Sequence, residues 1–103
     1  MLRGIELELE YSKIIHRKGT PLLISPKFLR SMGAGQIDMA NIVNKENIKC
    51  INLFEIKASI IPSKTQIKRL RTSQALLSEI FDQNIRLFLC KGDPRQGSSV
   101  YLI

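Results

Sequence analysis

The chain has 103 residues, which suits a single domain (residues 1–103) built around one hydrophobic core. Its 44% hydrophobic content argues against disorder, and neither a secretory signal core nor an apolar run of roughly 18 residues, enough to span a membrane, is visible. Sixteen Lys and Arg against nine Asp and Glu give a net charge of +7, which suggests a polyanionic partner, nucleic acid before anionic membrane, or else a solvated basic face.

The first half of the chain is expected to open with a helix. Apolar residues recur at helical spacing over residues 4–18, although the alternation from Ile5 to Glu10 would equally suit a strand. The length of this segment and the stop at Gly19 favour the helix. A short strand at 22–25 and a partly basic loop at 25–35 are expected to follow.

The second half predicts most of a sheet and a second helix. Strands are expected at 36–43 and 50–58, joined by a polar turn. Ser63 is a plausible N-cap for a helix that runs to about Gln83. Strands at 85–91 and 99–103 complete the order α-β-β-β-α-β-β, which is typical of an α/β protein.

Three charged side chains interrupt the two predicted strands. Glu55 and Lys57 lie two residues apart in an apolar segment, so they share one face of a strand. Asp38 lies in the preceding strand segment. If these strands pair, two carboxylates and an amine converge, which is what a divalent cation and an activated water require for phosphodiester cleavage. For Glu55 and Lys57 alone, an ion pair at the margin of the sheet would be the simpler interpretation.

Positive charge is concentrated beside these residues. Between positions 49 and 71 there are six basic residues and one acidic residue, Glu55. Lys64, Lys68 and Arg71 recur at a spacing of four and three, so they share one helix face, and Arg69 lies about a quarter turn away. We expect this face to lie against a nucleic-acid backbone next to the metal, contacting phosphates without reading sequence.

The pattern of residues 4 to 91 resembles the PD-(D/E)XK nucleases, the restriction-endonuclease-like superfamily, and most of all archaeal-type Holliday-junction resolvases. Gly4 followed by Glu8 is similar to the opening helix motif of the resolvases. Gly-Gln-Ile-Asp at 35–38 is similar to the strand with the essential aspartate, and Phe-Glu-Ile-Lys at 54–57 to the (D/E)XK strand. Ile37 replaces the proline of the family motif, and Gln66 lies where resolvases often carry a glutamine.

The resemblance implies a restriction-endonuclease-like fold, with a mixed central sheet flanked by helices, and a role for each motif residue. Asp38, Glu55 and the carbonyl of Ile56 would bind Mg²⁺ or Mn²⁺, with Glu8 as a further direct or water-mediated ligand. Lys57 would orient or deprotonate the attacking water, and Gln66 would position the water or the phosphate. Glu6 and Glu10, by contrast, are expected to form only a solvated acidic face.

These observations predict a metal-dependent endonuclease that hydrolyses the phosphodiester bonds of duplex or branched DNA. A Holliday-junction resolvase acting as a homodimer is one form of this hypothesis, since two-fold symmetry suits paired cuts. A restriction, repair or mobile-element nuclease is another. A non-catalytic nucleic-acid-binding module or subunit on the same fold is the alternative from a different class. We expect the protein in the cytoplasm, or in the host cytoplasm if it is viral.

Overall fold

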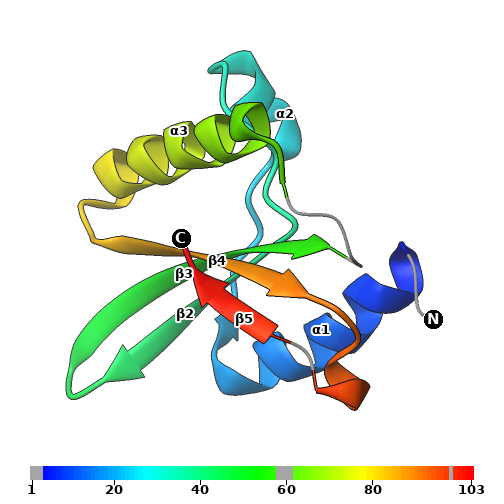
Figure 1. Cartoon of the computed structure of the whole chain (residues 1–103). Coiled ribbons are helices and arrows are strands. Elements are labelled where there is room, and N and C mark those ends of the chain that lie inside the picture. The colour runs from blue at the N-terminus through cyan, green and yellow to red at the C-terminus, as the bar shows by residue number, and fades with distance from the viewer. Residues whose placement is uncertain (1–3, 58–61, 98) are drawn as a thin grey trace.

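The computed structural model describes residues 4–57, 62–97 and 99–103 (Figure 1). The predicted strand residue Ala58 and turn residue Ser98 lie outside the described residues. The elements, in chain order, are α1 (Ile5–Lys18), β1 (Thr20–Pro21), α2 (Pro26–Ser31), β2 (Met39–Lys45), β3 (Ile48–Lys57), α3 (Lys64–Phe81), β4 (Ile85–Lys91), the 3₁₀ turn η1 (Pro94–Gln96) and β5 (Ser99–Leu102).

The five strands form one mixed sheet, in the order β1-β2-β3-β4-β5. β3 pairs antiparallel with β2 and parallel with β4, and α3 makes the crossover between β3 and β4. In the register of β2 and β3, Met39 lies opposite Phe54. This register brings the start of β2 beside the end of β3, so Asp38, just before β2, comes close to Glu55.

Helices cover both faces of the sheet, giving three layers: α1 lies on one face, and α2 and α3 lie on the other (Figure 1). Leu70 and Leu77 of α3 and Leu29 of α2 pack in one buried cluster with the sheet. Tyr11 of α1 packs on the opposite face in a second cluster, which includes Ile56. Since side chains alternate along β3, Ile56 faces α1 while Glu55 and Lys57 face α3.

The structure confirms α1, β4 and an α3 that begins after Ser63, and it corrects the segment between α1 and β2. A helix, α2, forms in the predicted loop, because Ser25 accepts the N–H of Phe28 and Pro26 occupies the first turn. The strand before it is β1 at Thr20–Pro21, not 22–25. The observed order is therefore α-β-α-β-β-α-β-β, with the 3₁₀ turn before β5. Among the described residues, no helix is long and apolar enough to cross a membrane.

Candidate active site

A pocket of about 300 Å³ opens between the end of β3 and the first half of α3. Most of the residues predicted to act together meet in it, although they come from three separate segments of the chain. The residues that line the pocket are Gly35, Gln36, Asp38, Glu55, Lys57, Gln66, Arg69 and Leu70.

Asp38 is held in place by the backbone of the neighbouring strand. The N–H of Ile56 donates a hydrogen bond of 2.8 Å to Oδ2 of Asp38. Asp38 lies one residue before β2, and so it was wrongly predicted to be inside a strand. The bond leaves Oδ1 and the remaining lone pair of Oδ2 for another partner, and it ties this carboxylate to the strand that carries Glu55.

Glu55 and Asp38 form a coupled pair of carboxyl groups. Burial raises the pKa of Glu55 to about 8, and the hydrogen bond to Asp38 and the negative charge of Asp38 act in the same direction. The positive charge of Lys57 and the backbone N–H of Ile56 lower it only in part. Near neutral pH the protonated Glu55 therefore donates to Asp38, and a cation between the two groups would replace this proton.

The raised pKa of Glu55 predicts a pH dependence of stability. Without divalent cations, the folded chain keeps a proton that the unfolded chain loses near pH 4.5, so stability falls as the pH rises from about 4.5 through about 8. Glu55→Gln should flatten this fall, since its amide can still donate to Asp38 without ionising. Urea denaturation in EDTA between pH 4.5 and 9 measures the effect, and equal slopes for the two proteins would contradict it.

Lys57 follows Glu55 on the same face of β3 and lines the same pocket. Its partner in the parallel register is Lys91 of β4, which does not line the pocket. Two lysines thus end neighbouring strands, but only Lys57 lines the pocket with the carboxylates. The convergence predicted for Asp38, Glu55 and Lys57 is present.

Glu8 lies near enough to Asp38 to feel its negative charge, but it does not line the pocket. Its side chain on α1 is exposed, and partial burial and the negative charge of Asp38 raise its pKa. Glu6 and Glu10 instead act on Arg95 at the other side of α1, and Glu10 pairs with Lys13 at 3.1 Å. The negative charge of Asp38 thus reaches Glu8 on α1.

Gln66 has a structural role as well as its place in the pocket. Its side-chain Oε1 accepts the N–H of Ser63 at 3.2 Å, and Ser63 Oγ accepts the N–H of Gln66 at the same distance. These two hydrogen bonds form a capping box at the start of α3, and this helix-capping role of Gln66 was not predicted. Since Oε1 is engaged, the amide nitrogen is the group left for a ligand in the pocket.

The predicted basic face of α3 lies outside the pocket that holds the carboxylates. Arg69 lines the pocket, whereas Lys64, Lys68 and Arg71 are exposed and do not line it. At 100° per residue these three lie on the side of α3 opposite Leu70 and the rest of the buried stripe. Of the four basic residues of α3 predicted to contact nucleic acid, Arg69 is thus the one that lines the pocket with the carboxylates.

Two features escaped the sequence analysis. Gln36 lines the pocket, and it and Asp38 also line an adjoining hollow of about 540 Å³ beside α2. Lys27 and Arg30 project from the unpredicted α2 and are exposed. Gln36 could have been found from the Gly-Gln-Ile-Asp motif, of which it is part. Lys27 and Arg30 could not, because only the packing of α2 beside α3 brings them to the same side of the sheet as the basic residues of α3.

The donor set decides which cation these residues fit. Magnesium commonly takes one or two carboxylates and completes its octahedron with waters and substrate phosphates. Asp38 and Glu55 provide such a pair, and a divalent charge would offset the burial and the negative charge of Asp38 that raise the pKa of Glu55. Within the described parts of the chain, no three His, Cys, Asp or Glu side chains gather into a site of their own. Asp38 and Glu55 thus have the donor chemistry that an open Mg²⁺ or Mn²⁺ site requires.

Comparisons with protein-family models, curated proteins and solved structures found no match to this chain.

Proposed function

We propose that the protein is a metal-dependent DNA endonuclease with a restriction-endonuclease-like core. The observation that carries the proposal is the convergence of Asp38, Glu55 and Lys57 on one pocket beside a basic helix. The carboxylates of Asp38 and Glu55 would provide oxygen donors for Mg²⁺ or Mn²⁺, and the resemblance adds the carbonyl of Ile56 and Glu8, which would bind directly or through water. When bound, the cation would lower the pKa of a water and offset charge on the phosphate.

The side chains around the pocket would divide the remaining work. Lys57 would orient the attacking water, take up or relay its proton and stabilise the charge that develops on the phosphate. The guanidinium of Arg69 suits a phosphate oxygen, since it can donate two parallel hydrogen bonds. The free amide nitrogen of Gln66 would donate to the same phosphate or to the water.

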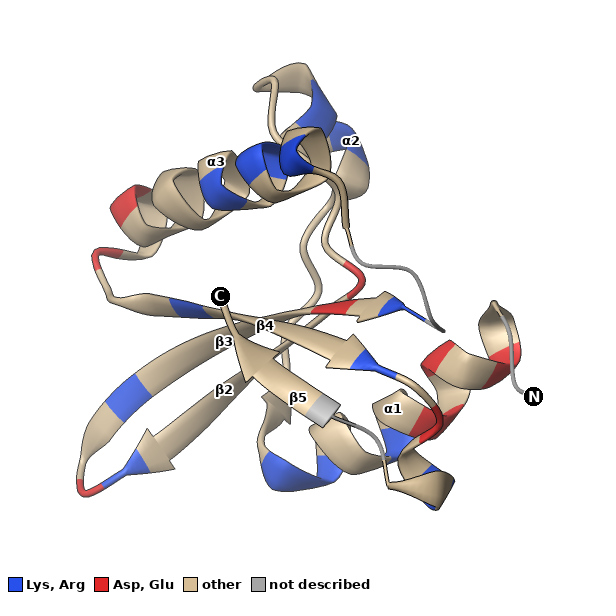
Figure 2. Ribbon diagram, in the orientation of Figure 1, with Lys and Arg blue, Asp and Glu red and all other residues tan. Residues whose placement is uncertain are grey.

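The outward surface of α2 and α3 suits a polyanion at longer range. Figure 2 shows basic residues on α2 and along the first half of α3, while the first half of α1 carries acidic ones. Residues 20–37 and 62–78 contain no Asp or Glu. The ion pairs present among the described residues, Lys13–Glu10 and Arg95–Asp93, lie outside this surface. We call it the basic ridge, and its members are Lys27, Arg30, Lys64, Lys68 and Arg71.

Removing charge from the basic ridge should weaken DNA binding without regard to sequence. Lys64→Ala, Lys68→Ala and Arg71→Ala together should reduce the slope of log affinity against log salt by about 0.9 for each phosphate that the variant no longer neutralises. Fluorescence anisotropy with duplex DNA at several salt concentrations measures the slope.

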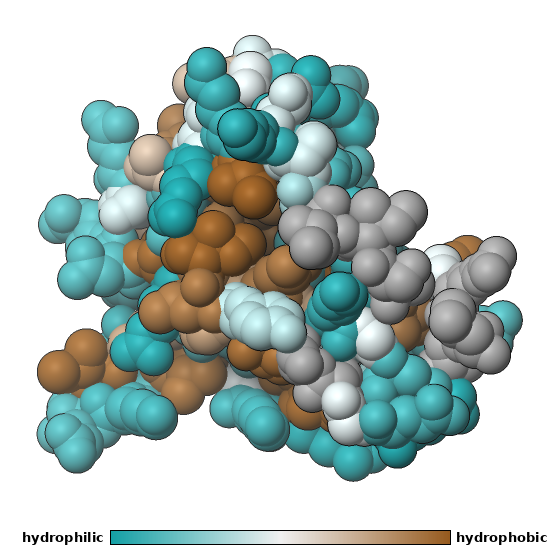
Figure 3. Space-filling model, viewed as in Figure 1, coloured by the Kyte–Doolittle hydropathy of each residue, from teal (hydrophilic) through white to brown (hydrophobic). Residues whose placement is uncertain are grey.

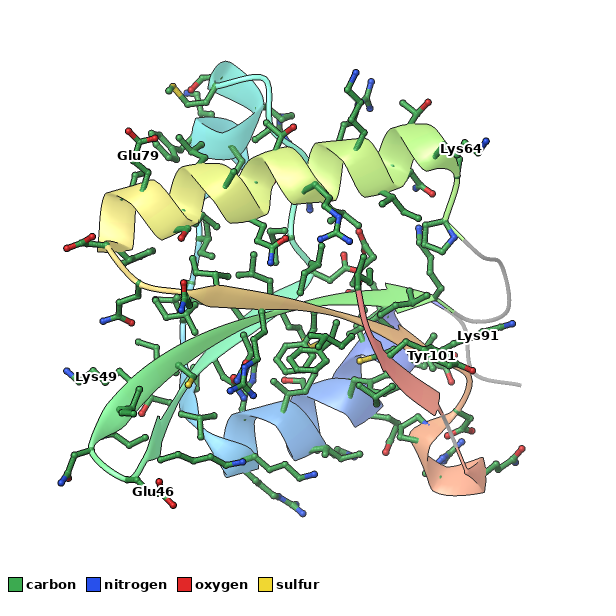
Figure 4. All side chains as sticks on the ribbon, turned by 60° about the vertical axis from the view of Figure 1, so that its left-hand side comes forward. Glu46, Lys49, Lys64, Glu79, Lys91 and Tyr101 are labelled. Atoms are coloured by element: carbon green, nitrogen blue, oxygen red, sulfur yellow. The ribbon has the colours of Figure 1, made fainter. Side chains whose placement is uncertain are left out.

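The matched control for this variant removes three exposed lysines elsewhere: Lys18→Ala, Lys45→Ala and Lys49→Ala. Figure 4 shows how far Lys49, near the tip of the β2–β3 hairpin, lies from Lys64 at the start of α3. Equal slopes for both triple variants would mean that net charge, and not the basic ridge, attracts the DNA.

The direct test of the proposed function is cleavage of a panel of DNA structures. Duplex, single-stranded, flap and four-way-junction DNA would be incubated with Mg²⁺ or Mn²⁺, and with EDTA as the control. Cutting that needs the cation supports the nuclease, and preference for the junction supports a resolvase. DNA binding without cutting or cation binding would favour the non-catalytic module.

The homodimer is part of the same proposal. β5 is an edge strand, and its Val100 and Leu102 are 55% and 66% exposed. Hydrophobic side chains also gather between α3 and β5 (Figure 3), near Tyr101 (Figure 4). A two-fold contact between β5 edges would cover them. Sedimentation of the wild type and Leu102→Lys tests this arrangement, and identical monomers would overturn it.

A further inference from the structure

The loop that carries Asp38 is fastened by hydrogen bonding to α3 at Arg69, one of the residues that line the pocket from this helix. The N–H of Gly35 donates to the carbonyl of Arg69 at 3.3 Å. In return, Ser73 Oγ donates to the carbonyl of Gly35 at 2.6 Å, with the carbonyl of Arg69 at 3.1 Å as a weaker acceptor. Ser73 is completely buried, so this hydrogen bond is shielded from water.

The fastening also depends on the missing side chain of Gly35. A Cβ there would lie 2.9 Å from Cβ of Arg69 and 3.2 Å from its carbonyl carbon. The first distance is shorter than real Cβ contacts and the second is tighter than most of them, and the neighbouring atoms are the Cβ and backbone of a helix residue, which cannot yield as the end of a flexible side chain would. The glycine is therefore needed for close approach.

We propose that Ser73 and Gly35 are positioning residues that hold Asp38 and Arg69 at a set separation across the pocket. Ile37, between Gly35 and Asp38, is buried in the core, which shortens the free chain between the fastening and the carboxylate. Asp38 is then held from two sides, by the fastening on α3 and by the N–H of Ile56 on β3. The roles of Asp38 as cation ligand and Arg69 as phosphate ligand rest on the proposed function, but the fastening itself does not.

Ser78 provides a matched control for Ser73. It lies on the same helix, and its Oγ donates to the carbonyl of Gln83 at 2.7 Å. Its hydroxyl therefore holds the loop after α3, as the hydroxyl of Ser73 holds the loop before β2. Ser73→Ala and Ser78→Ala each remove one such bond, so both should lower the melting temperature. Only Ser73→Ala releases the loop that carries Asp38.

Two measurements separate positioning from stability. Isothermal titration with Mn²⁺ alone should give a dissociation constant about 10- to 100-fold higher for Ser73→Ala, as for other residues that orient a metal ligand, and an unchanged one for Ser78→Ala. The ¹⁵N-HSQC signal of the Ile56 amide, which reports on its bond to Asp38, should shift in the first variant only. Gly35→Ala disrupts the same contact from the loop side, so it should also raise the dissociation constant for Mn²⁺ and shift the Ile56 signal.

The outcomes distinguish this inference from the proposed function. If the wild type binds no Mn²⁺, the proposed metal site is wrong, and the Ile56 signal still tests the fastening. If Ser73→Ala and Gly35→Ala both leave the Ile56 signal as in the wild type, the fastening does not position Asp38, whatever the protein does to DNA.

Discussion

Asp38→Asn and Glu55→Gln are each expected to lower Mg²⁺-dependent DNA cleavage by about 10³-fold or more. The cation contributes several kcal/mol of charge stabilisation in the transition state, and each 1.36 kcal/mol is worth a factor of ten in rate. Both substitutions keep the shape of the side chain and remove the negative charge that holds the cation. DNA binding should tighten or persist for Asp38→Asn, since a negative charge leaves a pocket that faces phosphate, and it should persist for Glu55→Gln, since Glu55 carries a proton near neutral pH when no cation is bound.

Single-turnover cleavage in Mg²⁺ and binding in EDTA measure these two quantities separately. Glu6→Gln is the matched control, because it removes the same charge from an exposed residue of α1 that does not line the pocket. Wild-type cleavage by either Asp38→Asn or Glu55→Gln would show that the site is assigned to the wrong residues.

Lys57→Ala should reduce the rate of the chemical step by about 10² to 10⁴-fold, the usual contribution of a group that handles the proton of the attacking water. Affinity for DNA should fall far less, because the variant leaves Arg69 in the pocket and the whole basic ridge unchanged. Lys91→Ala is a close control: the two lysines are partners in the parallel register of β3 and β4, and only Lys57 lines the pocket. Equal reductions of rate and affinity in Lys57→Ala would make it a phosphate anchor.

The elements that could be predicted from the sequence are those whose cause lies in neighbouring residues. The helix after Ser63 was predicted because its N-cap immediately precedes it, and the amphipathic pattern continues the signal for several turns. The six-residue α2 was missed because its Ser-Pro start resembles a turn as much as a helix. Asp38 was placed within a strand, but the register with β3 begins only at Met39.

The candidate site shows the same division. That Glu55 and Lys57 share a face follows from the two-residue period of a strand, so the sequence by itself determined it. The meeting of Asp38 with Glu55 was a conditional prediction, which the pairing of β2 with β3 fulfils.

Only the tertiary structure decided which basic residue of α3 reaches the pocket. Helical spacing groups Lys64, Lys68 and Arg71 correctly, but it does not say which way that group faces. Burial of Leu70, Ser73 and Leu77 against the sheet turns the group outward and brings Arg69 to the carboxylates. The pKa of Glu55 and the fastening of Gly35 to Ser73 also arise from contacts between distant segments. Their physical cause is packing and burial, which a pattern along one chain does not contain.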